Sequence, residues 1–271
     1  MTISRHNRQM EMIDLWNNNE IEVLKSNYIL EGDNNLPNLL GKSPNAIRIK
    51  ASRLGISKFG YKANITLSSL EEQVILGGLM GDLYCRIREK NKNAQIQGAH
   101  CKKQEDYLLW KVNILKSLSF SFRRNKAGYL FFDSKNYPCL NEYYHLFYKN
   151  GKKTITEEVL NKIETFGLAI WYMDDGSYSN RDKSSRLYTN GFTYDENLLI
   201  KKWFENRWGV FPKITIYKDE KRCPGRVRYF LTFNVRETKK LIDMIRNYIH
   251  PSMNYKIGET FEIKSETNNG A

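Results

Sequence analysis

Two apolar segments decide the fold of this chain: Ile75-Leu76-Gly77-Gly78-Leu79-Met80-Gly81-Asp82 and Leu168-Ala169-Ile170-Trp171-Tyr172-Met173-Asp174-Asp175-Gly176. Each is typical of a helix that is apolar on almost every side, and such a helix must be buried all round. Three glycines in the first segment (Gly77, Gly78 and Gly81) leave adjoining turns without side chains, so another helix backbone can approach closely. We therefore expect the two helices to pack side by side.

Each of these helices ends in acid, so the packing brings carboxylates together. Asp82 and Asp175 then emerge at one end of the pair, where they cannot both stay ionised without a nearby cation. A carboxylate at a helix C-terminus is also unfavourable with the helix dipole. Mg²⁺ prefers such oxygen ligands, and bound metal stabilises the oxygens of a phosphodiester under attack. Asp174 points about 100° away round the helix, which favours a capping role or support of the ligands.

The elements around the two helices repeat in type and order. The first unit begins with a capping box at Ser68 and Glu71, and the second has a capping box at Thr193 and Glu196. Both units read αββαββα, with the expected helices and strands at 70–82, 84–90, 94–100, 105–118, 119–124, 129–134 and 137–148, then at 166–175, 177–180, 186–191, 193–208, 213–218, 226–233 and 237–249. The predicted fold class is α+β, with two pseudo-symmetric units related by a two-fold axis.

The first sixty residues form a separate small helical module in this reading. Short helices are expected over 21–28 and 36–40, and a third begins after Ser43 and stops at Gly55. The module resembles a helix-turn-helix or Myb/SANT-like domain, in which the third helix enters a DNA groove. The candidate DNA contacts on that helix are Arg48, Lys50 and Arg53. A small bundle that only packs or tethers is the alternative. The predicted domains are 1–60, 61–163 and 164–271.

The charge of the chain favours a polyanionic partner. Lys and Arg number 43 against 30 Asp and Glu, giving a net charge of +13. Such an excess speeds association with nucleic acid, although a basic but unspecialised surface has the same composition. The longest apolar run, 74–80, is too short to span a membrane. Four dispersed cysteines exclude a zinc ribbon and four dispersed histidines disfavour a histidine-metal centre. We expect an intracellular, non-secreted protein without membrane contact.

Four short motifs in order resemble the two-motif, single-chain LAGLIDADG homing endonucleases. They are Leu-Met-Gly-Asp-x-Tyr at 79–84, Lys-Lys-Thr-Ile at 152–155, Leu-Ala-x-Trp-Tyr-Met-Asp-Asp-Gly at 168–176 and Pro-x-Met-x-Tyr-Lys at 251–256. The resemblance covers about residues 67 to 262. Leu83 stands where a glycine usually follows the acid, and Ile170 stands where the family name has glycine.

The resemblance implies a metal-dependent catalytic centre. It assigns metal binding to Asp82 and Asp175, with about two or three Mg²⁺ ions and with Mn²⁺ able to substitute. It also places Lys153 and Lys256 at the active site, Lys152 being the alternative to Lys153. A lysine there organises the attacking water or neutralises charge that develops on the phosphate.

The strands of both units carry the predicted DNA contacts. Basic and polar side chains alternate with apolar ones, so one face of each sheet is cationic. The residues assigned to DNA are Arg86, Arg88, Lys90, Gln97, Arg186, Tyr188, Asn190, Arg226 and Arg228. A two-stranded ribbon fits the major groove, where Arg reads guanine and Asn or Gln reads adenine. A merely solvated sheet face also alternates, and Gln97 and Asn190 have the alternative role of holding pocket waters.

The expected function is that of a site-specific endonuclease that cuts both strands of DNA as a monomer. Because the two halves differ in sequence, the target should be long and non-palindromic. Two alternatives stay open: a maturase that binds intron RNA on the same fold, and a non-catalytic DNA-binding regulator that uses the N-terminal helices. No mitochondrial presequence is evident, which favours a bacterial or phage-host cytoplasm over an organelle.

Overall fold

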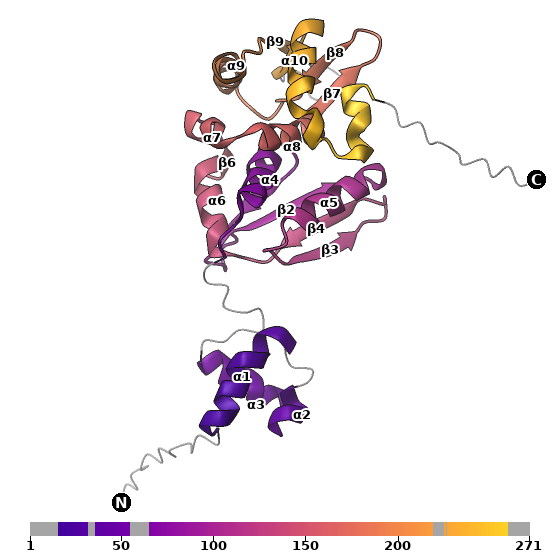
Figure 1. The fold of residues 1–271 in the computed structure, drawn as a ribbon. Coiled ribbons are helices and arrows are strands. Elements are labelled where there is room, and N and C mark those ends of the chain that lie inside the picture. The colour runs from indigo at the N-terminus through magenta and orange to yellow at the C-terminus, as the bar shows by residue number, and fades with distance from the viewer. Residues whose placement is uncertain (1–15, 32–35, 55–64, 219–224, 226, 260–271) are drawn as a thin grey trace, which may run out of the picture. The chain divides into compact units, whose positions relative to one another are not determined.

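The chain forms two compact units, residues 1–64 and 65–271, in the computed structural model (Figure 1). The structure describes residues 16–31, 36–54, 65–218, 225 and 227–259. Both αββαββα repeats lie in the second unit, so the two halves predicted as separate domains share one body. Within the described ranges, the helices are all too short or too polar to pass through a bilayer.

The first unit is a three-helix module, as predicted. Its helices are α1 (Asn18–Glu31), α2 (Leu36–Leu40) and α3 (Pro44–Arg53). They bury a small core of their own, made of Leu24, Tyr28, Leu36, Leu40, Ile47 and Ala51.

The second unit contains the predicted αββαββα order twice. The first repeat consists of α4 (Ser69–Met80), β1 (Tyr84–Arg86), β2 (Gln95–His100), α5 (Glu105–Ile114), β3 (Phe120–Arg124), β4 (Leu130–Ser134) and α6 (Asn141–Phe147), with the short 3₁₀ helices η1 (Lys102–Gln104) and η2 (Pro138–Leu140). A two-stranded ribbon, β5 (Tyr148–Lys149) and β6 (Lys152–Lys153), and helix α7 (Glu157–Lys162) lead to the second repeat. That repeat consists of α8 (Thr165–Asp175), β7 (Gly176–Ser179), β8 (Ser184–Leu187), α9 (Tyr194–Trp208), β9 (Lys213–Lys218), β10 (Val227–Phe233) and α10 (Val235–Ile245), followed by η3 (Arg246–Tyr248) and η4 (Pro251–Ile257).

The two repeats build equivalent antiparallel sheets. Their strand orders are β1-β2-β4-β3 and β7-β8-β10-β9, which are the same order counted within each repeat. Both expected capping boxes are present, since Ser68 and Thr193 each exchange hydrogen bonds with the glutamate three residues on. These boxes cap α4 and α9, which are not equivalent helices, so the repeats match in topology and not in their helix caps.

Helices α4 and α8 pack directly against each other at the junction of the repeats (Figure 1). A Cβ on Gly77 would clash with the Gly167 carbonyl oxygen and would lie 2.9 Å from the Ile170 Cβ. Only hydrogen fits there, so the glycine in the first helix allows the close approach that the sequence predicted. The core that surrounds the pair is continuous across both repeats.

Several strands are shorter than predicted. The hairpin of β1 and β2 closes at Arg86 and Gln95, whereas pairing was expected to reach Lys90. The reason is that Ala94, the next partner in register, donates its N–H to the Asn141 side chain and pairs with Tyr137. Tertiary partners thus take the backbone groups that a longer hairpin needs.

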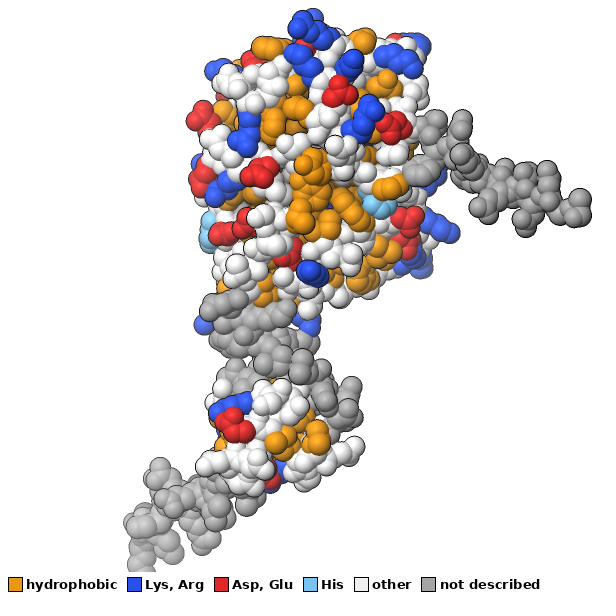
Figure 2. All heavy atoms as spheres, in the orientation of Figure 1, with side chains coloured by type: hydrophobic (Ala, Val, Ile, Leu, Met, Phe, Trp, Pro, Cys, Tyr) orange, Lys and Arg blue, Asp and Glu red, His pale blue; other side chains and the backbone are white. Residues whose placement is uncertain are grey.

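The surface of the second unit mixes both charges on the face seen in Figure 2. Lys and Arg side chains are dispersed there around a central group of hydrophobic side chains. The excess of positive charge is therefore not concentrated on this face.

We predict that Gly77→Ala destabilises the second unit by about 1–3 kcal/mol, because the methyl group forces α4 away from α8. Chemical denaturation followed by circular dichroism measures the change. Gly191→Ala is the matched control, since a Cβ at Gly191 meets nothing within 4 Å. Equal stability of the two variants would contradict the close-packing argument.

Candidate active site

The two acids predicted to bind metal lie at the ends of the paired helices, but the backbone holds them differently. Asp175 is the last residue of α8, and its carbonyl accepts a hydrogen bond from the Tyr188 N–H at 3.0 Å. Helix α4 ends at Met80 and is capped by Gly81, so Asp82 lies in the turn that follows. The predicted helix over 70–82 was therefore slightly too long.

The acids share one electrostatic environment. Burial raises the pKa of Asp175 to about 8, with the charges of Asp82 and Asp174 adding to the effect. Burial also raises the pKa of Asp82 to about 6, together with the charge of Asp174, although 39% of the Asp82 side chain is exposed. Repulsion between like charges with too few counter-charges is the condition that a bound cation relieves.

Lys153 and Lys256 occupy equivalent positions in the two repeats. Lys153 Nζ donates to the carbonyls of Leu79 and Leu83, at 2.6 and 3.0 Å. Lys256 Nζ donates to the carbonyls of Met173 and Asp174, at 2.5 and 2.8 Å. Each lysine therefore lies against the C-terminal end of the helix that carries the acid of its own repeat, where a cation is favourable with the helix dipole.

Burial distinguishes these lysines from their neighbours on the surface. It lowers the pKa of Lys153 to about 8 and lowers the pKa of Lys256, while the nearby aspartates act in the opposite direction. Lys152 is exposed. The lysine near the acids in the first repeat is thus Lys153 and not Lys152.

Asp174 is the centre of a buried polar network that the sequence only partly revealed. Its Oδ2 accepts from the backbone N–H of Asp82 at 3.2 Å, so Asp174 supports the turn that carries Asp82. Its Oδ1 accepts from Tyr107 Oη and from Lys111 Nζ, both at 2.8 Å. Tyr107 and Lys111 lie on α5 in the first repeat, one turn apart. They were missed because that spacing on an apolar helix is typical of core side chains.

His100 also lies beside Asp82, and sequence reasoning missed it as well. Its Nδ1 is 3.8 Å from Asp82 Oδ2 and 3.2 Å from Gln104 Oε1. Burial lowers the pKa of His100 to about 4, so the ring is neutral. Possible ligand atoms of Asp82, His100 and Asp174 lie within 4.8 Å of one another.

The residues present fit a hard divalent cation at the two helix ends. The Asp174 carboxylate is not free to ligate, since Lys111 and Tyr107 already bind it. Asp82 and Asp175 remain as carboxylates with raised pKa values and no such partners among the hydrogen bonds of the described residues. Paired carboxylate oxygens without direct counter-ions suit Mg²⁺ or Mn²⁺.

The first sheet presents polar atoms that lack partners. Arg86 lies on β1 and Gln97 on β2, and Tyr84 pairs with Gln97 in register. Arg86 Nε and Gln97 Oε1 are buried, and neither has a hydrogen-bond partner in the described part of the chain. Arg88 and Lys90 are exposed but lie in the connection after β1, so they were wrongly placed on a strand.

The second sheet brings together a comparable set. Arg186 on β8 lies over the Phe230 ring at 5.7 Å, and the Tyr188 ring is 5.7 Å from the same ring. Arg228 lies on β10 as predicted. Asn190 was expected on a strand but lies in a turn, because β8 ends at Leu187. Arg226 falls outside the described residues.

The third helix of the N-terminal unit exposes two of its three predicted contacts. Arg48 and Arg53 are exposed. Lys50 is 7% exposed and its Nζ lies 6.0 Å from the centre of the Trp16 ring, so it is part of the packing of this unit and not of its outer surface.

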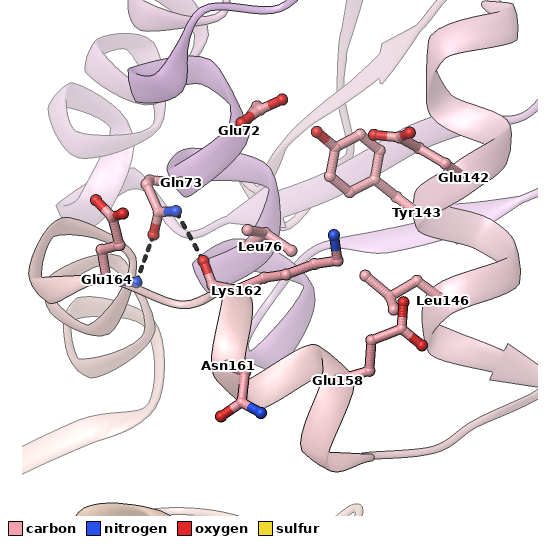
Figure 3. A pocket seen from close by; sticks show the side chains of 10 residues that line it. All are labelled: Glu72, Gln73, Leu76, Glu142, Tyr143, Leu146, Glu158, Asn161, Lys162 and Glu164. Atoms are coloured by element: carbon pink, nitrogen blue, oxygen red, sulfur yellow. Dashed lines mark hydrogen bonds between the residues drawn. The ribbon is translucent and has the colours of Figure 1, made fainter. Parts of the chain in front are cut away.

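A cavity of about 350 Å³ lies away from the paired acids, between α4, α6 and α7 (Figure 3). Four glutamates line it, at positions 72, 142, 158 and 164. The Gln73 amide crosses one end of it, accepting from the Glu164 N–H and donating to the Lys162 carbonyl. Four carboxylates repel a polyanion, so this cavity is not the place where a nucleic acid binds.

A duplicated α+β fold with one acid and one lysine from each repeat at a shared centre defines the class of protein. Residues 72–241 match the model of the LAGLIDADG DNA endonuclease family. The chain belongs to this family, as its motifs predicted.

The chain is also similar to individual curated proteins. The chain is 32% identical over 198 residues to Protein RecA of Mycolicibacterium fallax, covering 70% of this chain and 47% of that protein. It is 30% identical to a probable intron-encoded DNA endonuclease 3 of Mycosarcoma maydis, covering 46% of this chain and 90% of the relative. A cytochrome b mRNA maturase bI2 of Debaryomyces hansenii is 26% identical, over 69% of this chain and 72% of the relative.

A solved structure has the same fold. The homing endonuclease I-WcaI bound to its DNA recognition sequence aligns with a TM-score of 0.63 and 23% identity, over 81% of this chain and 96% of that one. The chain spans about half the length of the RecA relatives that it matches.

We predict that the metal-free protein loses stability as pH rises from about 4 to 8. The folded protein keeps protons on Asp82 and Asp175 that the unfolded chain has already released, so unfolding becomes more favourable over this window. Asp175→Asn should reduce this loss of unfolding free energy by about 1–3 kcal/mol. Each kcal/mol corresponds to a change in melting temperature of about 2–4 °C.

Thermal unfolding in EDTA across this pH range tests the prediction, with Asp243→Asn as the control. Asp243 is 55% exposed on α10, and this variant should follow the wild-type curve. A wild-type melting temperature that stays constant or rises over this pH range would contradict the raised pKa values of the two acids.

Proposed function

We propose that this chain is a site-specific endonuclease that hydrolyses both strands of a DNA duplex with divalent metal ions. The observation that carries the proposal is the packing of α4 against α8, which brings Asp82 and Asp175, one from each repeat, into one electrostatic environment. A pair of acids at a junction of two equivalent halves suits a substrate with two equivalent strands.

Asp82 and Asp175 would hold the metal, which activates water and stabilises the charge on the phosphate when bound. Lys153 and Lys256 place positive charge on either side of this centre. They offset the charge of the acids, and we propose that they also stabilise the negative charge that builds up on a phosphodiester.

The two sheets would read different sequences. The first presents Arg86 and Gln97, and the second presents Arg186, Tyr188 and Arg228. Both halves belong to one chain, so a monomer contacts the whole site. We therefore propose a long, non-palindromic target. I-WcaI, which has the same fold, was solved bound to its DNA recognition sequence.

A second function is favoured by one relative, the cytochrome b mRNA maturase. We propose intron RNA as a further ligand of the same fold. Binding of a structured intron transcript in competition with duplex DNA tests this. Affinity for the transcript no greater than for a scrambled RNA of equal length would exclude a maturase role.

We predict that Asp82→Asn and Asp175→Asn each lower cleavage by at least about 100-fold, since each removes a negatively charged ligand. Binding to the same duplex in Ca²⁺ should stay within about threefold of the wild type. The substrate is a duplex that wild-type protein cuts, selected from a randomised library in Mg²⁺. Cleavage by either variant at the wild-type rate would remove that acid from the mechanism.

We predict that Arg86→Ala weakens binding of the selected duplex by about 1–3 kcal/mol and relaxes base preference at one position. Arg86 lies on the first sheet, and its buried Nε has no hydrogen-bond partner among the described residues. Arg236→Ala is the control, because this arginine is 83% exposed on α10 and lies outside both sheets. Equal effects of the two substitutions would indicate a general loss of charge and not a contact.

A further inference from the structure

The two repeats differ at the residue that precedes each metal-binding acid. Asp174 precedes Asp175, whereas Gly81 precedes Asp82. A Cβ on Gly81 would lie 2.6 Å from the Asp174 Cβ, so the glycine provides the space that the aspartate occupies. At this pair of equivalent positions, the second repeat therefore contributes the Asp174 carboxylate, and the first repeat contributes Gly81, which has no side chain.

This carboxylate is fully buried and fully bound. The Asp174 side chain is 0% exposed and the Lys111 side chain 1% exposed. Lys111 Nζ also lies 4.4 Å from the centre of the Tyr107 ring, so the three groups form one cluster. Removing the acid alone would leave an unpaired buried ammonium group, and removing the lysine alone would leave an unpaired buried carboxylate.

The cluster has no equivalent in the second repeat. Helix α9 occupies there the place that α5 has in the first repeat. The structure describes α9 throughout, and its buried side chains are Asn197, Ile200, Trp203 and Phe204, none of which is charged. The buried ion pair of Lys111 with Asp174 therefore supports only the side of the centre that carries Asp82.

Asp82, on the supported side, lies in a turn beyond the end of its helix, whereas Asp175 is still within α8. Asp175 is fixed by helix α8 and by the hydrogen bond between its carbonyl and the Tyr188 N–H. Asp82 follows the end of α4, and its own N–H is directed to Asp174 across the repeat junction. The position of Asp82 thus depends on a side chain of the other repeat.

We propose that Asp174, held by Lys111 and Tyr107, is a positioning residue that fixes the turn carrying Asp82. This inference rests on the proposed function, in which Asp82 is a metal ligand. By the pseudo-symmetry, each acid lies nearer to one of the two scissile strands. Loss of the cluster then impairs one strand break more than the other.

The test replaces both charged partners together, as Lys111→Met with Asp174→Leu, so that no buried charge is left unpaired and no side-chain acceptor remains for the Asp82 N–H. The substrate is the selected duplex, end-labelled on each strand in turn. We expect one strand to be cut at least about tenfold more slowly relative to the other than in the wild type, and a nicked duplex to accumulate. The Mg²⁺ concentration that gives half the maximal rate should rise.

Leu108→Ala is the matched control, because Leu108 is buried on α5 and is outside the cluster. It destabilises the same helix and should leave the ratio of the two strand breaks unchanged. Equal slowing of both strands in the double variant, as in this control, would show that the cluster has only a structural role.

A second measurement needs neither metal nor DNA. Amide hydrogen exchange of the ¹⁵N-labelled protein should be at least about tenfold faster at Asp82 in the double variant, since its N–H loses the carboxylate acceptor. The Tyr188 amide, bound to the Asp175 carbonyl, should exchange as in the wild type. Unchanged exchange at Asp82 would overturn the proposal. If the wild type cuts no duplex, the proposed function fails, while the exchange rates still decide the positioning role.

Discussion

The close contact of α4 with α8 is the constraint on which the rest of the structure depends. Gly77 meets the Gly167 carbonyl without room for a methyl group, and this distance sets how near the two helix ends come. Because both helices are buried all round, they carry the core of two repeats at once. The contact between these two helices sets the positions of the sheets, the acids and the lysines.

The contact of α4 with α8 also brings buried carboxylates near one another, which is the electrostatic condition that favours a bound metal ion. It forces Asp82, Asp174 and Asp175 into one small region, and burial raises the pKa of two of them. One acid is neutralised by Lys111, while Lys153 and Lys256 bind helix carbonyls and act on the acids only through space. Asp82 and Asp175, whose pKa values are raised, can release their protons in exchange for a bound cation.

Much of this arrangement could be predicted from local sequence. The capping boxes, the repeated order of elements and the helix pair each follow from patterns within about fifteen residues. Placing the helices side by side also predicted that Asp82 and Asp175 share one metal site, which stays a prediction. The family resemblance assigned Lys153 with Lys152 as the alternative, and in the structure Lys153 contacts the end of α4 while Lys152 is exposed.

The errors have a common cause in tertiary partners. The first hairpin is short because Asn141 and Tyr137, more than forty residues away, take the backbone of Ala94. Lys50 was expected on a DNA-binding face but packs near Trp16. The spacing of Tyr107 and Lys111 is typical of core side chains, and only their contact with Asp174 reveals a link between the repeats.

The complementary fit of Gly81 with Asp174 bears on whether two copies of one repeat could form the same contact. A symmetric dimer of two first repeats would face glycine with glycine and leave a void at its axis. A dimer of two second repeats would press two carboxylates into the same space. At this contact the two halves are therefore complementary in shape and not identical.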